Sequence, residues 1–159
     1  MDIEKKIELS ESYKGWWHSI DLGDGVWTDG KKRGHFPVHE RVMKHEALKW
    51  DFPEDYFRDK DVLDVGAWDG FFSFYAEQNG ASSVTSLDVW GRYSGVNREG
   101  FDIARKVLDS KVEPVQMDIM DATPDNLGTF DVIIFAGVLY HLDYPYKALN
   151  ILSDLLNDG

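Results

Sequence analysis

Residues 61–74, DVLDVGAWDGFFSF, join a short apolar run to an aromatic-rich segment through a turn that two glycines bracket. The run contains β-branched residues and predicts a buried parallel strand, and the aromatic segment has helical character. A strand, a tight loop and a helix N-terminus in this order gather free backbone N–H groups and a positive dipole end at the carboxyl edge of a sheet. The segment therefore predicts a site for a nucleotide-like ligand.

Further strands and helices are expected to surround this segment. Apolar patterns predict strands at 83–88, 112–117 and 130–136 and helices at 71–78, 97–109 and 146–156. Strands and helices that alternate in this way, with right-handed crossovers, predict an α/β fold of the Rossmann-like, doubly wound parallel type.

The predicted sheet is truncated after its fourth strand and the helix that follows. The sequence ends in Asn157-Asp158-Gly159, a helix C-cap pattern, where a fifth strand is expected. The fourth strand, 130–136, would then be an open and very apolar edge, and such an edge invites pairing. We expect the chain to self-associate or to bind a partner that covers this edge.

Composition bounds the class of protein. A chain of 159 residues with 43% hydrophobic residues indicates one domain with a real core. The absence of cysteine excludes disulfides and thiolate metal sites, and the spacing of the histidines predicts no metal site. The charged N-terminus and the lack of a long apolar run predict neither a signal peptide nor a membrane span, so a cytoplasmic location is the default.

Residues 1–52 are expected to form an N-terminal cap of helices and loops, and residues 53–159 the ligand-binding domain. The cap begins with a predicted amphipathic helix, residues 1–13, with Ile3, Ile7 and Leu9 facing inward. A turn-rich segment at 15–34 and a surface helix at 39–50 follow. The tryptophans of the turn-rich segment either cover the site as a lid or form the core of the cap: Trp16, Trp17 and Trp27.

Three carboxylates, Asp64, Asp88 and Asp118, fall at or just past successive strand ends. Because the carboxyl ends of parallel strands meet at one edge, we expect the three to share it. Asp88 follows the glycine turn at the spacing of an acceptor for the two hydroxyls of a ribose. Each acid alone is also compatible with a helix N-cap or a loop, but together they predict an adenosine site. Asp118 would accept from the adenine amino group, between the apolar side chains of Val89, Trp90 and Ile119.

The glycine turn narrows the kind of adenosine ligand. Gly66-Ala67-Trp68-Asp69-Gly70 is not a G-x-G-x-x-G fingerprint, and Trp68 replaces the glycine that lets a pyrophosphate lie close to the backbone. No Gly-Lys-Ser/Thr follows, which excludes a Walker A loop. A dinucleotide is therefore disfavoured.

The motif series LDVGAWDG (63–70), Asp88, Asp118-Ile119 and FAGVLYH (135–141) resembles that of class I S-adenosylmethionine-dependent methyltransferases, over about residues 60–159. GVLYH, with Asp143-Tyr144-Pro145 after it, is similar to the tRNA 5-methoxyuridine/5-carboxymethoxyuridine wobble-position methyltransferase group and its looser relatives. RGHF (33–36) resembles the basic-Gly-Pro-Phe run of that group near the cofactor. The carboxylate-binding arginine found late in the tRNA enzymes has no counterpart, which disfavours a carboxylated cofactor.

The resemblance implies S-adenosylmethionine as the cofactor, and it implies a role for each motif. The turn and the strand before it would cradle the aminoacyl end, the acids and apolar residues after the second and third strands would hold the adenosine, and the segment after the fourth strand would touch the methionine end. The residues implied are Asp64, Gly66, Ala67, Trp68, Asp69, Gly70, Asp88, Val89, Trp90, Asp118, Ile119, Gly137, Val138 and Arg33.

The implied reaction is an in-line displacement at the sulfonium methyl, in which the protein mainly aligns the reactants. Tyr140 or His141 would orient or deprotonate an oxygen nucleophile, although His141 is also compatible with a plain loop histidine. The acceptor stays open between a tRNA wobble uridine and a small molecule, and the net charge of −12 opposes tight binding to tRNA. The rival hypothesis is a non-catalytic S-adenosylmethionine-binding regulatory module, or a fragment that needs a partner chain.

Overall fold

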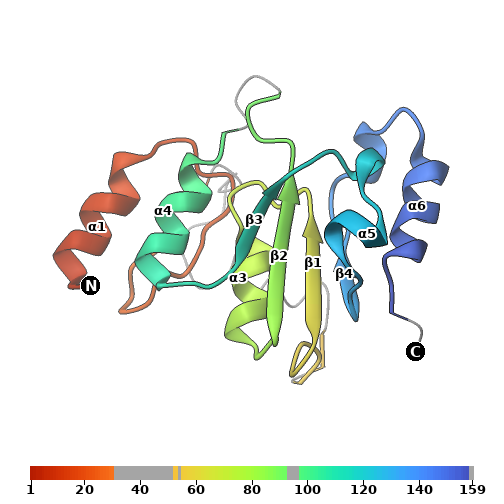
Figure 1. Cartoon of the computed structure of the whole chain (residues 1–159). Helices are drawn as coiled ribbons and strands as arrows, with labels where there is room; N and C mark the ends of the chain where they lie inside the picture. The colour runs from red at the N-terminus through yellow and green to blue at the C-terminus, as the bar shows by residue number, and fades with distance from the viewer. Residues whose placement is uncertain (31–51, 54, 93–96, 158–159) are drawn as a thin grey trace.

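The computed structural model of the chain describes residues 1–30, 52–53, 55–92 and 97–157. A sheet of four strands in the order β3-β2-β1-β4 forms its centre, and every adjacent pair is parallel (Figure 1). This order confirms the predicted Rossmann-like parallel sheet. The strands are β1 (Asp61–Val65), β2 (Ser83–Asp88), β3 (Glu113–Gln116) and β4 (Val132–Ile134).

The central strand β1 is buried on both faces of the sheet. Val62 pairs with Val84 of β2 and with Val132 of β4, and all three belong to one hydrophobic cluster. The next residue, Leu63, belongs to a second cluster. Because successive side chains of a strand point to opposite faces, the two clusters are the cores on the two sides of the sheet.

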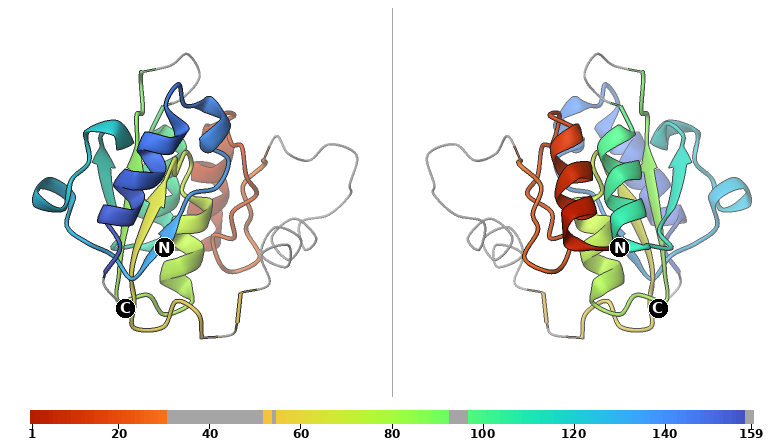
Figure 2. Two further views of the ribbon diagram at one scale, coloured as in Figure 1. Left: turned by 90° about the vertical axis from the view of Figure 1, so that its right-hand side faces the viewer. Right: turned by 90° about the vertical axis from the view of Figure 1, so that its left-hand side faces the viewer.

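Helices cover both faces, as a doubly wound sheet requires. α3 (Phe71–Gln78) and α4 (Glu99–Leu108) contribute Phe74 and Phe101 to the cluster of Val62. η2 (Ile119–Asp121) and α6 (Pro145–Asp154) contribute Ile119 and Leu152 to the cluster of Leu63. In the side views of Figure 2, α1 and the short α5 (Pro124–Leu127) lie on opposite sides of the strands.

The N-terminal helix α1 (Ile3–Ser12) forms where a helix was predicted, but its orientation differs from the prediction. Ile3 and Ile7 are 50% and 41% exposed, whereas Lys6 is buried. The Lys6 ammonium donates to the carbonyl of Leu22 at 2.8 Å, so its aliphatic stem covers the core while its charge is satisfied. The predicted inward face at Ile3 and Ile7 is therefore wrong.

The segment after α1 is part of the main core. Tyr13, Trp16, Ile20 and Leu22 belong to the same hydrophobic cluster as α3 and α4. Trp16 is fully buried and donates from its indole N–H to the carbonyl of Ser10 at 2.8 Å. Of the two roles predicted for the tryptophans, Trp16 has the core role.

β4 is the outer strand on one side of the sheet, and the chain end lies next to its beginning. The N–H of Phe130 donates to the carbonyl of Leu155, and the N–H of Asn157 donates to the carbonyl of Phe130, both at 2.8 Å. These bonds form an isolated parallel bridge between Phe130 and Leu156.

Of the helices in the described ranges, none combines the length and the apolar content that crossing a membrane needs.

Candidate functional site

The turn after β1 touches the loop after β4. Gly66 has a φ of +77°, and its N–H donates to the carbonyl of Leu87 at 2.8 Å. A Cβ at Gly66 would lie 2.3 Å from Cγ2 of Val138, far inside van der Waals contact. Glycine at this position therefore allows the two loops to approach each other at the carboxyl edge of the sheet.

Trp68 has a φ of +50° and so lies in the left-handed region of backbone conformation, which residues other than glycine rarely adopt. Both of its backbone groups are held: the N–H donates to Oδ2 of Asp88 at 2.7 Å, and the carbonyl accepts from the indole of Trp90 at 2.8 Å. Its ring stacks on that of Trp17, with 5.2 Å between centroids. These contacts offset the cost of the backbone conformation, and they bring the N-terminal segment over the turn.

Asp88, at the end of β2, faces the turn and is hydrogen-bonded to it. Its Oδ1 accepts from the N–H of Val89 at 2.6 Å and its Oδ2 from Trp68, so each oxygen is oriented by the backbone. A carboxylate offers about four acceptor positions, which leaves two for a ligand. Burial raises the pKa of the Asp88 carboxyl, and the two backbone hydrogen bonds oppose this shift.

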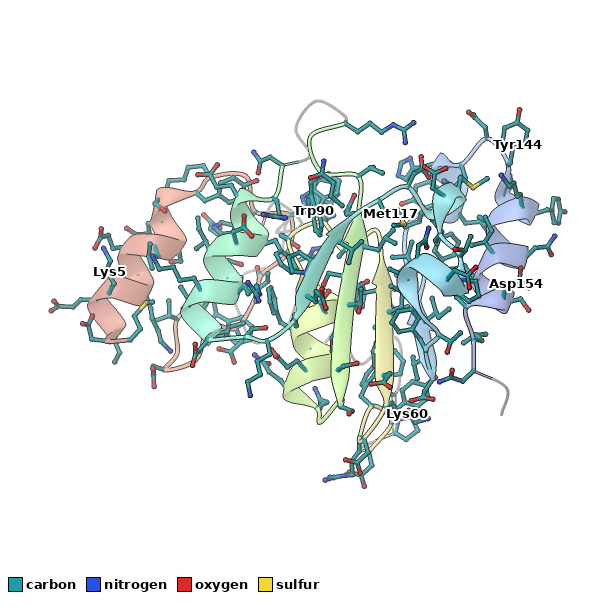
Figure 3. All side chains as sticks on the ribbon, viewed as in Figure 1. Lys5, Lys60, Trp90, Met117, Tyr144 and Asp154 are labelled. Carbon is teal, nitrogen blue, oxygen red and sulfur yellow. The ribbon has the colours of Figure 1, made fainter. Side chains whose placement is uncertain are left out.

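The predicted adenine surroundings are only partly exposed. Ile119 and Trp90 lie in the core, where Trp90 packs on Phe101 with 5.3 Å between ring centroids. Their side chains are buried, whereas the prediction placed them as apolar walls beside the adenine. Val89 stays half-buried. In Figure 3, Trp90 and Met117 lie at the end of the sheet to which the strand arrows point.

Asp118 is already engaged by the protein. Its Oδ1 accepts from the N–H of Met120 at 3.1 Å and caps η2, and its Oδ2 forms an ion pair with the guanidinium of Arg92. It lies at the predicted edge after β3, but an adenine amino group would share the carboxylate with Arg92.

Asp64 is enclosed inside the protein. Its side chain is buried within β1, where Oδ2 accepts from the hydroxyl of Ser73 at 2.5 Å, and the hydroxyl of Ser86 donates to that of Ser73 at 2.6 Å. Burial raises the pKa of Asp64 to about 7, against the hydrogen bond from Ser73. The prediction that this carboxylate lies at the ligand is replaced by a buried link between β1, β2 and α3.

Asp69 has a role that the sequence did not predict. Its Oδ2 accepts from the backbone N–H groups of Trp17 at 2.9 Å and His18 at 2.8 Å, and its Oδ1 lies 2.6 Å from Nδ1 of His18. At 2% exposure, this carboxylate is enclosed by these partners. His18 was missed because its partner lies 51 positions along the chain, and no spacing rule connects them.

The loop after β4 is the most exposed part of the site. Gly137 has a φ of +77°, and Tyr140 and His141 lie in η3 (Leu139–His141) with 4.3 Å between their ring centroids. Tyr140 is 78% exposed, and the nearby Tyr144 projects into solvent in Figure 3. An open hollow of about 300 Å³ adjoins this loop and is lined by Leu139, Tyr140, Pro145, Tyr146 and Leu149.

The described residues hold no group of three or more histidine, aspartate and glutamate side chains that would suit a metal ion. Arg33 and the predicted helix at 39–50 lie outside the described residues.

A family model described as a methyltransferase domain matches residues 38–159. The chain belongs to this methyltransferase domain family. Family and fold together confirm the resemblance to class I S-adenosylmethionine-dependent methyltransferases.

Curated relatives of this methyltransferase domain are longer proteins. The tRNA U34 carboxymethyltransferase of Actinobacillus succinogenes is 29% identical over 137 residues, which cover 85% of this chain and 38% of the relative. The protein of the same name from Nautilia profundicola is 28% identical over 133 residues, covering 80% of this chain and 43% of that protein. The chain thus spans less than half the length of these relatives.

Solved structures share the fold of the methyltransferase domain. The N-terminal domain of EvdMO1 with SAH bound has a TM-score of 0.70 at 19% identity and covers 98% of this chain and 63% of its own. An S-adenosylmethionine-dependent methyltransferase from Mesorhizobium loti has a TM-score of 0.54 at 20% identity and covers 76% of this chain and 51% of its own. At such identities the likeness concerns the fold alone.

Proposed function

We propose that the chain binds S-adenosylmethionine and transfers its methyl group to an oxygen atom of an acceptor. The observation that carries this proposal is Asp88. Its carboxylate lies at the end of β2, is oriented by the N–H groups of Trp68 and Val89, and keeps two acceptor positions free. Two adjacent hydroxyls of a ribose would fill these positions.

Other residues at the same edge would hold the rest of the cofactor. The turn from Gly66 to Gly70 would carry the methionine end, with Gly137 and Val138 on its other side, because Val138 already contacts Gly66. Val89 and Asp118 lie where the adenine would be bound. The bound cofactor supplies a methyl group already activated on a sulfonium, so the protein needs mainly to align an acceptor with it.

Tyr140 and His141 are proposed to serve the acceptor. As the new carbon–oxygen bond forms, the acceptor hydroxyl must lose its proton, and a histidine can take a proton near neutral pH. Both residues lie in the same loop as Gly137 and Val138, after Leu139, and both are exposed. An acceptor can therefore reach them from solvent.

We propose a planar acceptor, of which a tRNA wobble uridine is the leading example. Tyr140 and Tyr146 line one hollow, and their rings and that of Tyr144 are exposed. Exposed aromatic rings stack on unpaired bases. The names of the curated relatives support a tRNA, and a tRNA acceptor would place the reaction in the cytoplasm. The net charge of −12 keeps a planar small molecule as the second candidate.

Calorimetry with S-adenosylmethionine and S-adenosylhomocysteine tests the cofactor. The Asp88→Ala variant is expected to bind either ligand roughly tenfold more weakly or worse, because a charge-assisted hydrogen bond is lost. Asp121→Ala, which removes an exposed acid of η2, is the matched control and is expected to bind like the unsubstituted chain. If the unsubstituted chain binds neither ligand, the proposal fails.

A binding module without transfer is the second candidate, because the chain spans less than half of its curated relatives. Transfer of a labelled methyl group to bulk tRNA, or to a panel of planar small molecules, separates the two. Cofactor binding with no transfer to any acceptor favours the module.

A further inference from the structure

His18 is held rigidly beside the glycine turn. Oδ1 of Asp69 lies 2.6 Å from its Nδ1, and its ring stacks on that of Phe71 with 5.1 Å between centroids and 25° between planes. Phe71 is the first residue of α3, directly after the turn. A hydrogen bond in the ring plane and a stacking contact across it leave the imidazole one orientation.

This arrangement leaves one nitrogen of His18 available. A carboxylate oxygen only accepts, so Nδ1 carries the proton, and in the neutral ring Nε2 carries the lone pair. Nε2 has no hydrogen-bond partner among the described residues. In this part of the chain, every side-chain nitrogen or oxygen that is buried does have a partner. Nε2 is therefore open to solvent, in agreement with the 12% exposure of the side chain.

The residues next to His18 show where its segment lies relative to the turn. Trp17 stacks on Trp68, so residues 17 and 18 lie across the turn on one side. Val138 touches Gly66 and limits the turn on the side of β4. A ligand group bound at the turn would thus lie within reach of the N-terminal segment.

We infer that His18 binds the aminoacyl group of the cofactor through Nε2, and that Asp69 acts on this group only by orienting His18. The lone pair on Nε2 suits the α-ammonium group, which only donates hydrogen bonds. The inference rests on the proposed function, since it names a residue of the same cofactor site. In this inference, His18 contacts the aminoacyl group, and the buried carboxylate of Asp69 does not.

Two ligands and two substitutions test this inference. S-adenosylhomocysteine and 5′-methylthioadenosine share the adenosine and the thioether, but the second lacks the aminoacyl group. In His18→Asn, the amide nitrogen replaces Nδ1 and retains the bond to Asp69, while Nε2 is lost. Calorimetry is expected to show S-adenosylhomocysteine binding about tenfold more weakly, and methylthioadenosine binding within about twofold of the unsubstituted chain. His18→Gln, whose longer side chain reaches the position of Nε2, is expected to restore part of the loss.

Different outcomes overturn different statements. If His18→Asn weakens both ligands equally, or leaves S-adenosylhomocysteine unaffected, the role of His18 is refuted and the cofactor site stands. If the unsubstituted chain binds neither ligand, the proposed function is refuted together with this inference.

A chemical measurement on the unsubstituted chain covers the case in which His18→Asn does not fold. S-adenosylhomocysteine is expected to slow the modification of His18 by diethylpyrocarbonate, read by peptide mass mapping, whereas methylthioadenosine leaves the rate unchanged. Equal protection by the two ligands, or none by either, refutes the inference.

Discussion

Asp64 shows how a single buried carboxylate makes stability depend on pH. Burial raises the pKa of this side chain to about 7 in the folded protein, whereas an unfolded chain ionises near the ordinary value of 3.8. The folded state therefore holds a proton that the unfolded state has released. The stability contributed by Asp64 is fully present below the unfolded pKa and is lost as the pH rises through about 7.

Asp64→Asn is expected to remove this pH dependence. Between pH 5 and pH 7 the free energy of unfolding of the unsubstituted chain should fall relative to the variant by up to about 1.4 kcal/mol per pH unit, the value of one proton held by the folded state alone. Urea unfolding at several pH values measures it. Asp131→Asn is the control, because hydrogen bonds from the Asp61 N–H and Asn157 lower the pKa of Asp131 and its titration lies below this range. Parallel curves for Asp64→Asn and the unsubstituted chain would contradict the prediction.

At the scale of elements, the site depends on the contact between the turn after β1 and the loop after β4. Gly66 and Gly25 have the same φ of +77°, but a Cβ at Gly66 would lie 2.3 Å from Val138, while a Cβ at Gly25 would meet nothing within 4 Å. The pair therefore separates backbone strain from steric contact. A side chain in this region of φ costs about 1–2 kcal/mol by itself.

Gly25→Ala is expected to cost about this strain and no more. Gly66→Ala should cost more, and it should also weaken the binding of S-adenosylhomocysteine, because the two loops must move apart. The double variant Gly66→Ala/Val138→Ala should recover part of both losses, since the shortened side chain removes the clashing Cγ2. Chemical denaturation and calorimetry measure the two effects. Equal losses in the two glycine variants would show that the loop contact has no influence.

The whole molecule has two different sheet edges. β3 carries Pro114, which lacks an N–H, and the exposed Glu113, and both features discourage pairing. β4 consists of Val132, Ile133 and Ile134, without a charge or a proline. The parallel bridge to Leu156 is made by Phe130, which precedes β4, and does not include the three residues of β4.

We expect the chain of residues 1–159 to associate through β4 at micromolar concentration. Sedimentation velocity should show a weight-average mass that rises with concentration, and backbone amides of β4 should exchange more slowly as the concentration rises, while those of β3 do not change. A single monomeric species across the micromolar range would contradict this expectation.

The periodicity of the sequence was sufficient for the four strands and for α3, α4 and α6, in their order along the chain. β2 and α3 begin and end at the predicted residues. For α3 the boundaries are local signals, because Gly70 precedes the helix and Asn79 ends it. The position of Asp88 beside the glycine turn also followed from spacing, since the length of one strand-helix-strand unit places the end of β2 there.

What the tertiary structure alone decided is which side chains at this edge remain free to meet a ligand. Asp64, Asp69 and Asp88 look alike in the sequence, yet one is buried against Ser73, one holds His18, and one keeps acceptor positions open. These differences come from partners that lie 9, 51 and 20 positions away, where neither helical nor strand periodicity carries information. The sequence by itself thus determined the Rossmann-like sheet and its ligand edge, because local patterns encode both. Whether each carboxylate keeps free acceptor positions depends on its burial and its hydrogen-bond partners, which exist only after the chain has folded.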